Sequence, residues 1–191
     1  MKGIIFTEFL DFVEAQHGYE TVDTILENAA LPSQGAYTAV GNYEFSEITK
    51  LVRELSALHR KSEQDILRSF GRHLFAQYYR IYPLLFQDCT DPLEFLQTIE
   101  AKIHTEVLKL YPDAKLPNLK TERIGEDEVL LSYRSFRPLG QLCLGVIEGC
   151  GDHFGVNLVI EAEPAADGLD IRIRREAAAS RSGARKFEAF Q

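Results

Sequence analysis

The N-terminal part of the chain carries hydrophobic side chains at three- and four-residue spacing, the pattern of helices with one apolar face. This pattern predicts helices over residues 3–17, 20–31, 46–60 and 61–79. Gly18 suits the C-terminal stop of the first helix, and Ser62 suits the N-cap of the fourth. Gly71 interrupts the fourth helix. A tolerated glycine is the preferred interpretation, and close approach of another backbone is the alternative.

Residues 91–112 form the clearest helical pattern in the sequence. Asp91 can cap the N-terminus and Pro112 ends the pattern, so one uninterrupted α-helix is expected. His104 borders the apolar stripe of this helix, four residues after Glu100. From geometry alone, a histidine at such a border is more often a half-buried, locally hydrogen-bonded residue than a metal ligand.

The last part of the chain alternates between apolar and polar residues, which indicates strands. Two hairpins are predicted, one around the polar turn GEDE and one around Asp167 and Gly168, with a helix opened by Pro138 between them. Helices followed by antiparallel strands predict an α+β fold. We expect residues 1–175 to form a single domain and residues 176–191 to be a mobile or weakly helical tail.

In the stretch EVLLSYRSFR, alternate positions place Val129, Leu131, Tyr133, Ser135 and Arg137 on one face of a strand. This face passes from apolar side chains to three hydrogen-bond donors. A strand that leaves the core and surfaces in solvent is the interpretation that the segment alone favours. The alternative is a ligand with an apolar body and anionic ends, whose carboxylates an arginine and two hydroxyls would bind. A haem with its two propionates has this shape.

Composition limits the possible functions. The chain has 191 residues, a net charge of −8 and no long run of Lys or Arg, so nucleic-acid binding is not expected. No stretch is apolar enough to span a membrane and the N-terminus lacks a signal-peptide core, so we expect a cytoplasmic protein. Three cysteines, an odd number, fit a reducing compartment. No Ser/His/Asp or paired-carboxylate arrangement is evident, so no enzyme activity is expected.

Cys143, Cys150 and His153 recur near helical spacing and could contribute to a zinc site. The set lacks a convincing fourth ligand and the usual paired-cysteine spacing, so ordinary core or surface thiols are favoured. A small zinc-binding protein is therefore one alternative. A non-haem ligand-binding module of the same fold, holding another apolar carboxylate, is a second.

Several motifs together resemble one protein family. The run Tyr133-x-Ser135-x-Arg137 resembles the signature that holds the propionates in haem-nitric oxide/oxygen binding (H-NOX) domains, relatives of the haem domain of soluble guanylate cyclase. MKGIIF, SFGRHLF, IHTEVLKLYPDAKLP and LGVIEGCGDHF resemble the start, middle helix, proximal segment and post-signature helix of that family. The resemblance implies a bacterial stand-alone member, with helices followed by a four-stranded antiparallel sheet and haem buried between them.

The resemblance also implies a set of haem-binding residues. His104 corresponds to the proximal iron ligand, and Pro117 corresponds to the proline that presses on the porphyrin. Tyr133, Ser135 and Arg137 would bind the propionates of a non-covalent haem b. The distal wall would comprise Ile5, Phe9, Leu74, Tyr78, Leu142 and Val146.

The distal residues are expected to decide which gas binds. In family members that bind O₂, a tyrosine stands where this chain has Leu142 and donates a hydrogen bond to the gas. Leu142 has no donor, which favours binding of NO and CO and exclusion of O₂. Tyr78 could in principle supply a hydroxyl instead, but a core role is preferred for it.

The family mechanism implies a signal to a separate protein. NO would break the bond between iron and His104, release the helix that carries this residue and relax the haem against Pro117. In bacterial relatives the partner is a histidine kinase or a cyclic-di-GMP enzyme. This chain contains no segment that resembles either, so we expect a separate partner of one of these kinds.

Overall fold

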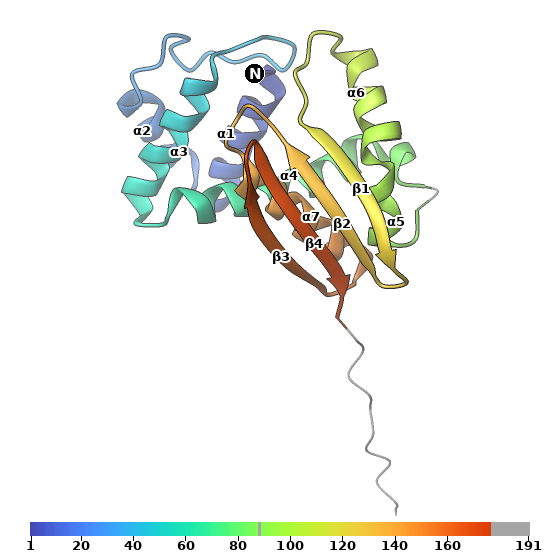
Figure 1. The fold of residues 1–191 in the computed structure, drawn as a ribbon. Coiled ribbons are helices and arrows are strands. Elements are labelled where there is room, and N and C mark those ends of the chain that lie inside the picture. The colour runs from blue at the N-terminus through green and yellow to red at the C-terminus, as the bar shows by residue number, and fades with distance from the viewer. Residues whose placement is uncertain (88, 177–191) are drawn as a thin grey trace, which may run out of the picture.

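The computed structural model describes residues 1–87 and 89–176 (Figure 1). In chain order its elements are α1 (Gly3–His17), α2 (Tyr19–Asn28), α3 (Phe45–His59), α4 (Glu63–Ile81), η1 (Pro83–Leu85), α5 (Pro92–Thr98), η2 (Ile99–His104), α6 (Thr105–Leu110), β1 (Asn118–Gly125), β2 (Glu128–Arg134), α7 (Gly140–Phe154), β3 (Leu158–Ala165) and β4 (Gly168–Arg175). No helix among the described residues is long and apolar enough to cross a bilayer. Except for Glu176, the predicted tail lies outside the described residues, and the single domain over residues 1–175 stays a prediction.

The N-terminal helices begin and end close to their predicted positions. α1 ends at Gly18, which has φ +85° and donates its backbone N–H to Glu14 O at 2.8 Å. The Ser62 hydroxyl caps α4 by accepting the Asp65 backbone N–H at 3.0 Å. The apolar faces of α1 to α4 form one core, in which Phe9 is fully buried.

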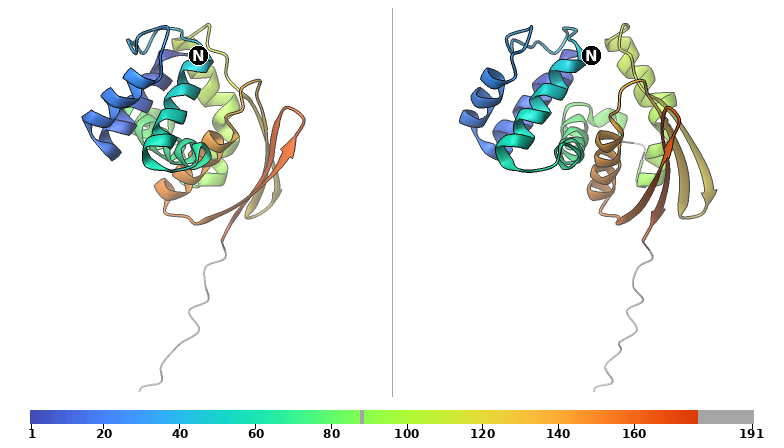
Figure 2. Two further views of the ribbon diagram at one scale, coloured as in Figure 1. Left: turned by 90° about the vertical axis from the view of Figure 1, so that its left-hand side faces the viewer. Right: turned by 60° about the vertical axis from the view of Figure 1, so that its left-hand side comes forward.

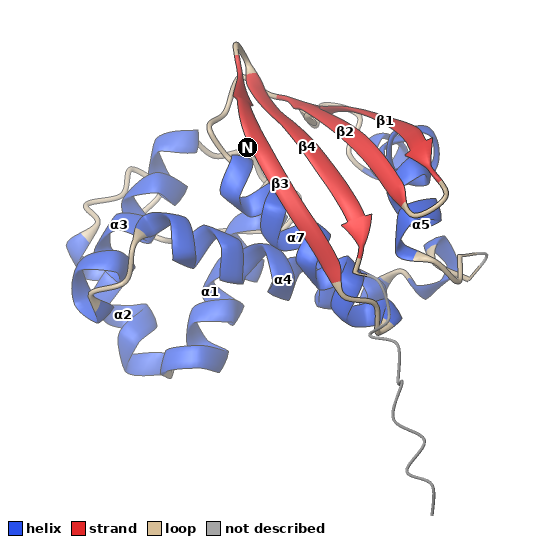
Figure 3. Cartoon of the chain, turned by 60° about the horizontal axis from the view of Figure 1, so that its bottom comes forward, coloured by secondary structure: helices blue, strands red, loops and turns tan. Residues whose placement is uncertain are grey.

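The four strands form one antiparallel sheet in the order β1-β2-β4-β3. Both predicted hairpins are present. Alternate residues bury one face of the sheet, and Val129, Leu131, Ile171 and Ile173 are at most 1% exposed. Figures 2 and 3 show the helices on this face, with α7 between the sheet and the N-terminal helices. The predicted α+β fold, helices first and a four-stranded antiparallel sheet after, is confirmed.

The helices α4 and α7 cross in close backbone contact. A Cβ at Gly71 would overlap the carbonyl oxygen of Leu142, and a Cβ at Gly145 would overlap the carbonyl oxygen of Arg68. Arg68 also pairs with Glu148 across the crossing, with Nε 2.7 Å from Oε1. The preferred interpretation of Gly71 as a merely tolerated glycine is therefore wrong, because another backbone does approach it.

Two local predictions need correction. The expected helix over residues 91–112 follows a helical path, but its middle part, η2, is a π-helix that ends at His104. A π-helix inside an α-helix is uncommon and occurs often at functional sites. The strand expected to carry the whole motif ends at Arg134, so Ser135 and Arg137 lie in the loop before α7.

The close crossing makes Gly145 a sensitive position. Alanine is about 1 kcal/mol better than glycine in an open helix, but here the added methyl would meet the α4 backbone, and overpacking costs about 1–3 kcal/mol. We expect Gly145→Ala to lower the Tm, measured by circular dichroism. Gly125→Ala is the control, because its nearest new neighbour would be Glu128 Cβ at 3.6 Å. Equal Tm values for the two variants would contradict the close crossing.

Candidate functional site

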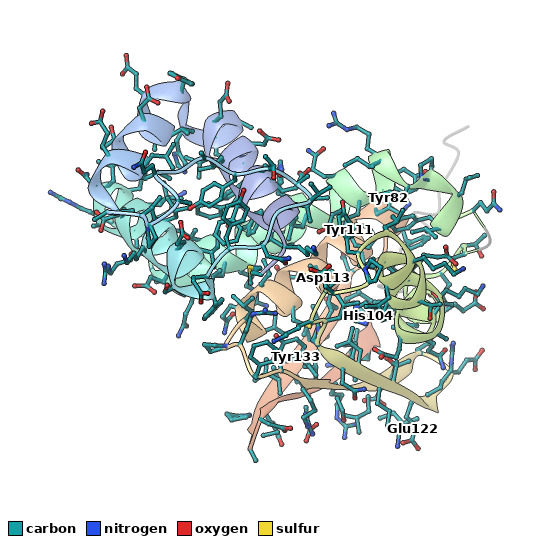
Figure 4. All side chains as sticks on the ribbon, turned by 90° about the horizontal axis from the view of Figure 1, so that it is seen from above. Tyr82, His104, Tyr111, Asp113, Glu122 and Tyr133 are labelled. Atoms are coloured by element: carbon teal, nitrogen blue, oxygen red, sulfur yellow. The ribbon has the colours of Figure 1, made fainter. Side chains whose placement is uncertain are left out.

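A cavity of about 790 Å³ lies between the N-terminal helices and the half of the molecule that contains the α5–α6 segment and the sheet. This volume is in the range of pockets that bind cofactors and other small ligands. In Figure 4, the labelled residues Tyr82, Tyr111, Asp113, His104 and Tyr133 lie along this boundary. α4 and α7 join the two halves and contribute to the wall of the cavity.

Most of the residues predicted to bind haem line this one cavity. Those that do are Ile5, Leu74, Tyr78, His104, Pro117, Tyr133, Ser135, Arg137, Leu142 and Val146. Phe9 does not line it. Its ring lies within the N-terminal core, with the centroid 5.1 Å from that of Phe70, so the structure places it behind the cavity wall.

His104 lies on the cavity wall with one ring nitrogen already bonded. Its Nδ1 is 2.9 Å from Oε2 of Glu100. A carboxylate accepts hydrogen bonds, so Nδ1 is the donor in this contact and Nε2 is the ring nitrogen left for a ligand bond. Nε2 has no hydrogen-bond partner in the described part of the chain. The side chain is 14% exposed. A metal-ligating histidine is commonly held in this way, by a carboxylate at its other ring nitrogen.

Arg137 also lines the cavity and brings a positively charged side chain to it. Its Nη1 donates to the carbonyl oxygen of Lys115 at 2.9 Å, but its Nε is buried without a partner among the described residues. Burial also lowers the pKa of the guanidinium, which indicates that an anion is needed to compensate for lost hydration. Tyr133, also on the wall, is 5% exposed. A cavity lined largely by apolar side chains, with a partly unsatisfied arginine, fits a haem with carboxylate ends.

Ser135 shapes the loop in which it lies. Its hydroxyl oxygen accepts the backbone N–H of Arg137 at 3.1 Å, a short local bond of the kind that serine makes in turns. Ser135 also lines the cavity, and its hydroxyl can donate to the neighbouring Tyr133 or to a ligand.

The distal wall contains one hydroxyl and one thiol. The Tyr78 hydroxyl has no hydrogen-bond partner within the described residues, and burial raises the pKa of its phenol, so it stays protonated and can donate. Burial raises the pKa of the Cys143 thiol to about 12, so this side chain is neutral. Leu142 supplies only apolar contact.

The proposed zinc ligands do not come together as a site. Among the described residues, no group of three or more His, Cys, Asp or Glu could hold a metal ion. Cys150 is buried, with its Sγ 3.9 Å from the carbonyl oxygen of Pro92, and His153 packs against the ring of Tyr79 at 3.9 Å between centroids. These contacts are those of packed side chains.

The sequence did not predict an ion pair between Lys2 and Asp113, two residues that line the cavity. Asp113 accepts from Lys2 Nζ at 2.7 Å and from Asn42 Nδ2 at 2.6 Å. These two bonds hold the pKa of Asp113 down, at about 2. They join the N-terminal residues to the segment that follows His104. No sequence signal marks them, because contacts between residues more than 70 positions apart depend on the tertiary fold.

The geometry of this site agrees with the comparisons with known proteins. The sequence model of the haem-NO-binding family (HNOB) matches residues 2–162. The structure is similar to Fe(II) unliganded H-NOX protein from K. algicida, with 39% identity, a TM-score of 0.86, and 93% of this chain and 98% of that chain covered. No match was found among curated proteins.

Two further solved structures are similar. The IWP-051-bound H-NOX from Shewanella woodyi in the Fe(II)CO state shares 34% identity, with a TM-score of 0.79 and with 98% and 99% of the two chains covered. An H-NOX protein from S. oneidensis in the Fe(II)NO state shares 27% identity, with a TM-score of 0.85 and with 92% and 99% covered. With the match to the family model, these similarities show that the chain belongs to the haem-NO-binding (H-NOX) family, whose members are haem-based gas-sensor domains and not enzymes.

Proposed function

We propose that this protein binds haem b non-covalently in the cavity and senses NO and CO. The observation that carries the proposal is His104, whose Nε2 is free on an apolar cavity wall while Nδ1 is held by Glu100. When bound, the group would supply an Fe(II) centre whose open position takes a diatomic gas. A cytoplasmic location stays a prediction from the sequence.

The carboxylate ends of the haem would be held at the other side of the cavity. Arg137 has unused hydrogen-bonding capacity at Nε, and Tyr133 and Ser135 provide hydroxyl groups beside it. Pro117 lines the cavity in the segment that follows His104, where its rigid ring would contact the porphyrin. Arg137 would act through its charge, Tyr133 and Ser135 through hydrogen bonds, and Pro117 through its shape.

Selectivity for NO and CO over O₂ is proposed from Leu142. Bound O₂ takes up negative charge and needs a donor, whereas NO and CO bind well to ferrous haem without one. Tyr78 is the competing observation, because its protonated hydroxyl lines the cavity without a partner among the described residues. We assign Tyr78 to the packing of the wall, and the gas experiment below tests this choice.

We further propose that the signal leaves through the segment after His104. NO would release His104 from iron, so that α6 and the segment that carries Pro117 can move. Asp113 lies in this segment and is bonded to Lys2 and Asn42, so a displacement there would reach the N-terminal half. The receiver would be a separate protein, a histidine kinase or a cyclic-di-GMP enzyme.

The ligand role of His104 predicts a chemical rescue. His104→Gly should fold, lose most of its haem during purification, and regain it when imidazole is supplied, because the cavity would admit a free ligand. Absorption spectra of the reduced protein measure this. His153→Ala is the control, since His153 is exposed and lies outside the cavity. An unchanged ferrous spectrum in His104→Gly would remove His104 from the proposal.

Arg137 should contribute more to haem retention than Ser135. We expect Arg137→Ala to speed haem transfer to apomyoglobin about tenfold, because a charge-assisted bond is worth roughly twice a neutral one, and Ser135→Ala to have a smaller effect. Arg134→Ala is the matched control, since Arg134 bonds to Asp170 at 2.6 Å, away from the cavity. Equal transfer rates for the Arg137 and Arg134 variants would contradict the proposed contact.

Selectivity among NO, CO and O₂ is tested on the ferrous protein, with each gas supplied separately. We expect the unmodified protein to bind NO and CO but not O₂ in spectral titrations. Leu142→Tyr should add measurable O₂ affinity through one neutral hydrogen bond of about 1 kcal/mol, and Leu142→Phe, with the same ring and no hydroxyl, should not. Stable O₂ binding by the unmodified protein that Tyr78→Phe abolishes would overturn the selectivity and assign the donor to Tyr78.

A further inference from the structure

We infer that Glu100 is a positioning residue that sets the strength of the bond between His104 and iron and ties this ligand to the sheet. The inference rests on the proposed function, because it needs haem iron at His104 Nε2. It concerns a side chain that touches neither the iron nor the gas. Glu100 would act through the hydrogen bond that it accepts from His104.

Glu100 accepts hydrogen bonds from two donors. One oxygen, Oε2, is 2.9 Å from His104 Nδ1 and 3.0 Å from the backbone nitrogen of Leu119. Two side chains four residues apart on a helix can form a hydrogen bond without any further contact. The bond from Leu119 is therefore an additional restraint on the Glu100 carboxylate. The N–H of Leu119 belongs to β1, so it holds the carboxylate in place against a rigid element.

The bond from Leu119 ties Glu100 to the sheet. Leu119 pairs with Tyr133 in the register of β1 and β2. Tyr133 is one of the residues proposed to hold the haem carboxylates. Glu100 is thus anchored to β1 at the residue that lies opposite Tyr133 in the neighbouring strand β2. The π-helical segment that ends at His104 holds both Glu100 and the ligand.

The bond from His104 to Glu100 also affects how strongly the imidazole can bind a metal. A carboxylate that accepts the Nδ1–H bond draws the proton toward itself and makes the imidazole a stronger donor at Nε2. It also fixes the plane of the ring. Glu100 should therefore oppose the release of His104 and set how readily gas binding triggers it. The Glu100 side chain is 46% exposed, so water moderates the effect without removing it.

The experiment compares three variants of the ferrous, haem-loaded protein. Glu100→Ala removes both bonds, and Glu100→Gln keeps an accepting oxygen but removes the charge. Glu106→Gln is the matched control, because it removes the same charge from a residue that also lines the cavity but bonds to Lys109 at 2.6 Å instead of to the histidine. The readouts are the iron–histidine stretching frequency from resonance Raman spectra, the reduction potential, and the rate of haem transfer to apomyoglobin.

We expect both Glu100 variants to lower the iron–histidine stretching frequency and raise the reduction potential, and Glu106→Gln to leave both near the values of the unmodified protein. Loss of a partner behind a metal ligand typically weakens metal binding 10- to 100-fold. Haem transfer should therefore be about tenfold faster in Glu100→Ala, with partial recovery in Glu100→Gln because its oxygen still holds the ring.

The outcomes separate this inference from the proposed function. An unmodified protein that takes up no haem, or shows no iron–histidine vibration, would refute the proposed function and the inference with it. A normal vibration in the unmodified protein that neither Glu100 variant shifts relative to Glu106→Gln would overturn the inference alone. A shift in both Glu100 variants that the control lacks would support it.

Discussion

The crossing of α4 over α7 is the contact on which the rest of the structure depends. Gly71 and Gly145 allow the two backbones to meet, and the crossed helices together link the N-terminal core to the core beneath the sheet. α4 contributes Phe70 to the N-terminal core, and α7 contributes Ile147 to the core beneath the sheet. Residues of the same two helices line the cavity, so this crossing both joins the halves and sets the shape of the distal wall.

The cavity is lined by apolar side chains of both cores and by others that neither core covers. Leu110, at the end of the apolar stripe of residues 91–112, is 59% exposed and lines the cavity. Arg137 brings a buried Nε with no partner among the described residues to the same space. Exposed apolar surface and a buried N–H without a partner are both unfavourable unless a ligand covers them. A flat apolar group with carboxylates meets both requirements, which agrees with membership of the H-NOX family.

Two carboxylates tie down the segment that carries the proposed iron ligand. Glu100 accepts bonds from His104 and from Leu119 in β1, and Asp113 accepts bonds from side chains of the N-terminal half. The segment between them is therefore fixed to the sheet at one end and to the N-terminal residues at the other. Glu100 would resist movement of His104, and Asp113 would transmit it to the N-terminal half. This is the physical basis of the signalling proposal.

Local chemistry by itself determined the helices, their caps and the hairpins, because three- to four-residue and two-residue periodicity report which side of an element is apolar. The motif of Tyr133, Ser135 and Arg137 likewise pointed to the site, because its residue types and their spacing resemble the family signature. Only the tertiary structure decided which apolar residues meet. It placed Phe9 in a core, ended β2 before Ser135, and converted the turn before His104 into a π-helix. These outcomes depend on contacts between distant segments, and periodicity in one segment carries no information about its partners.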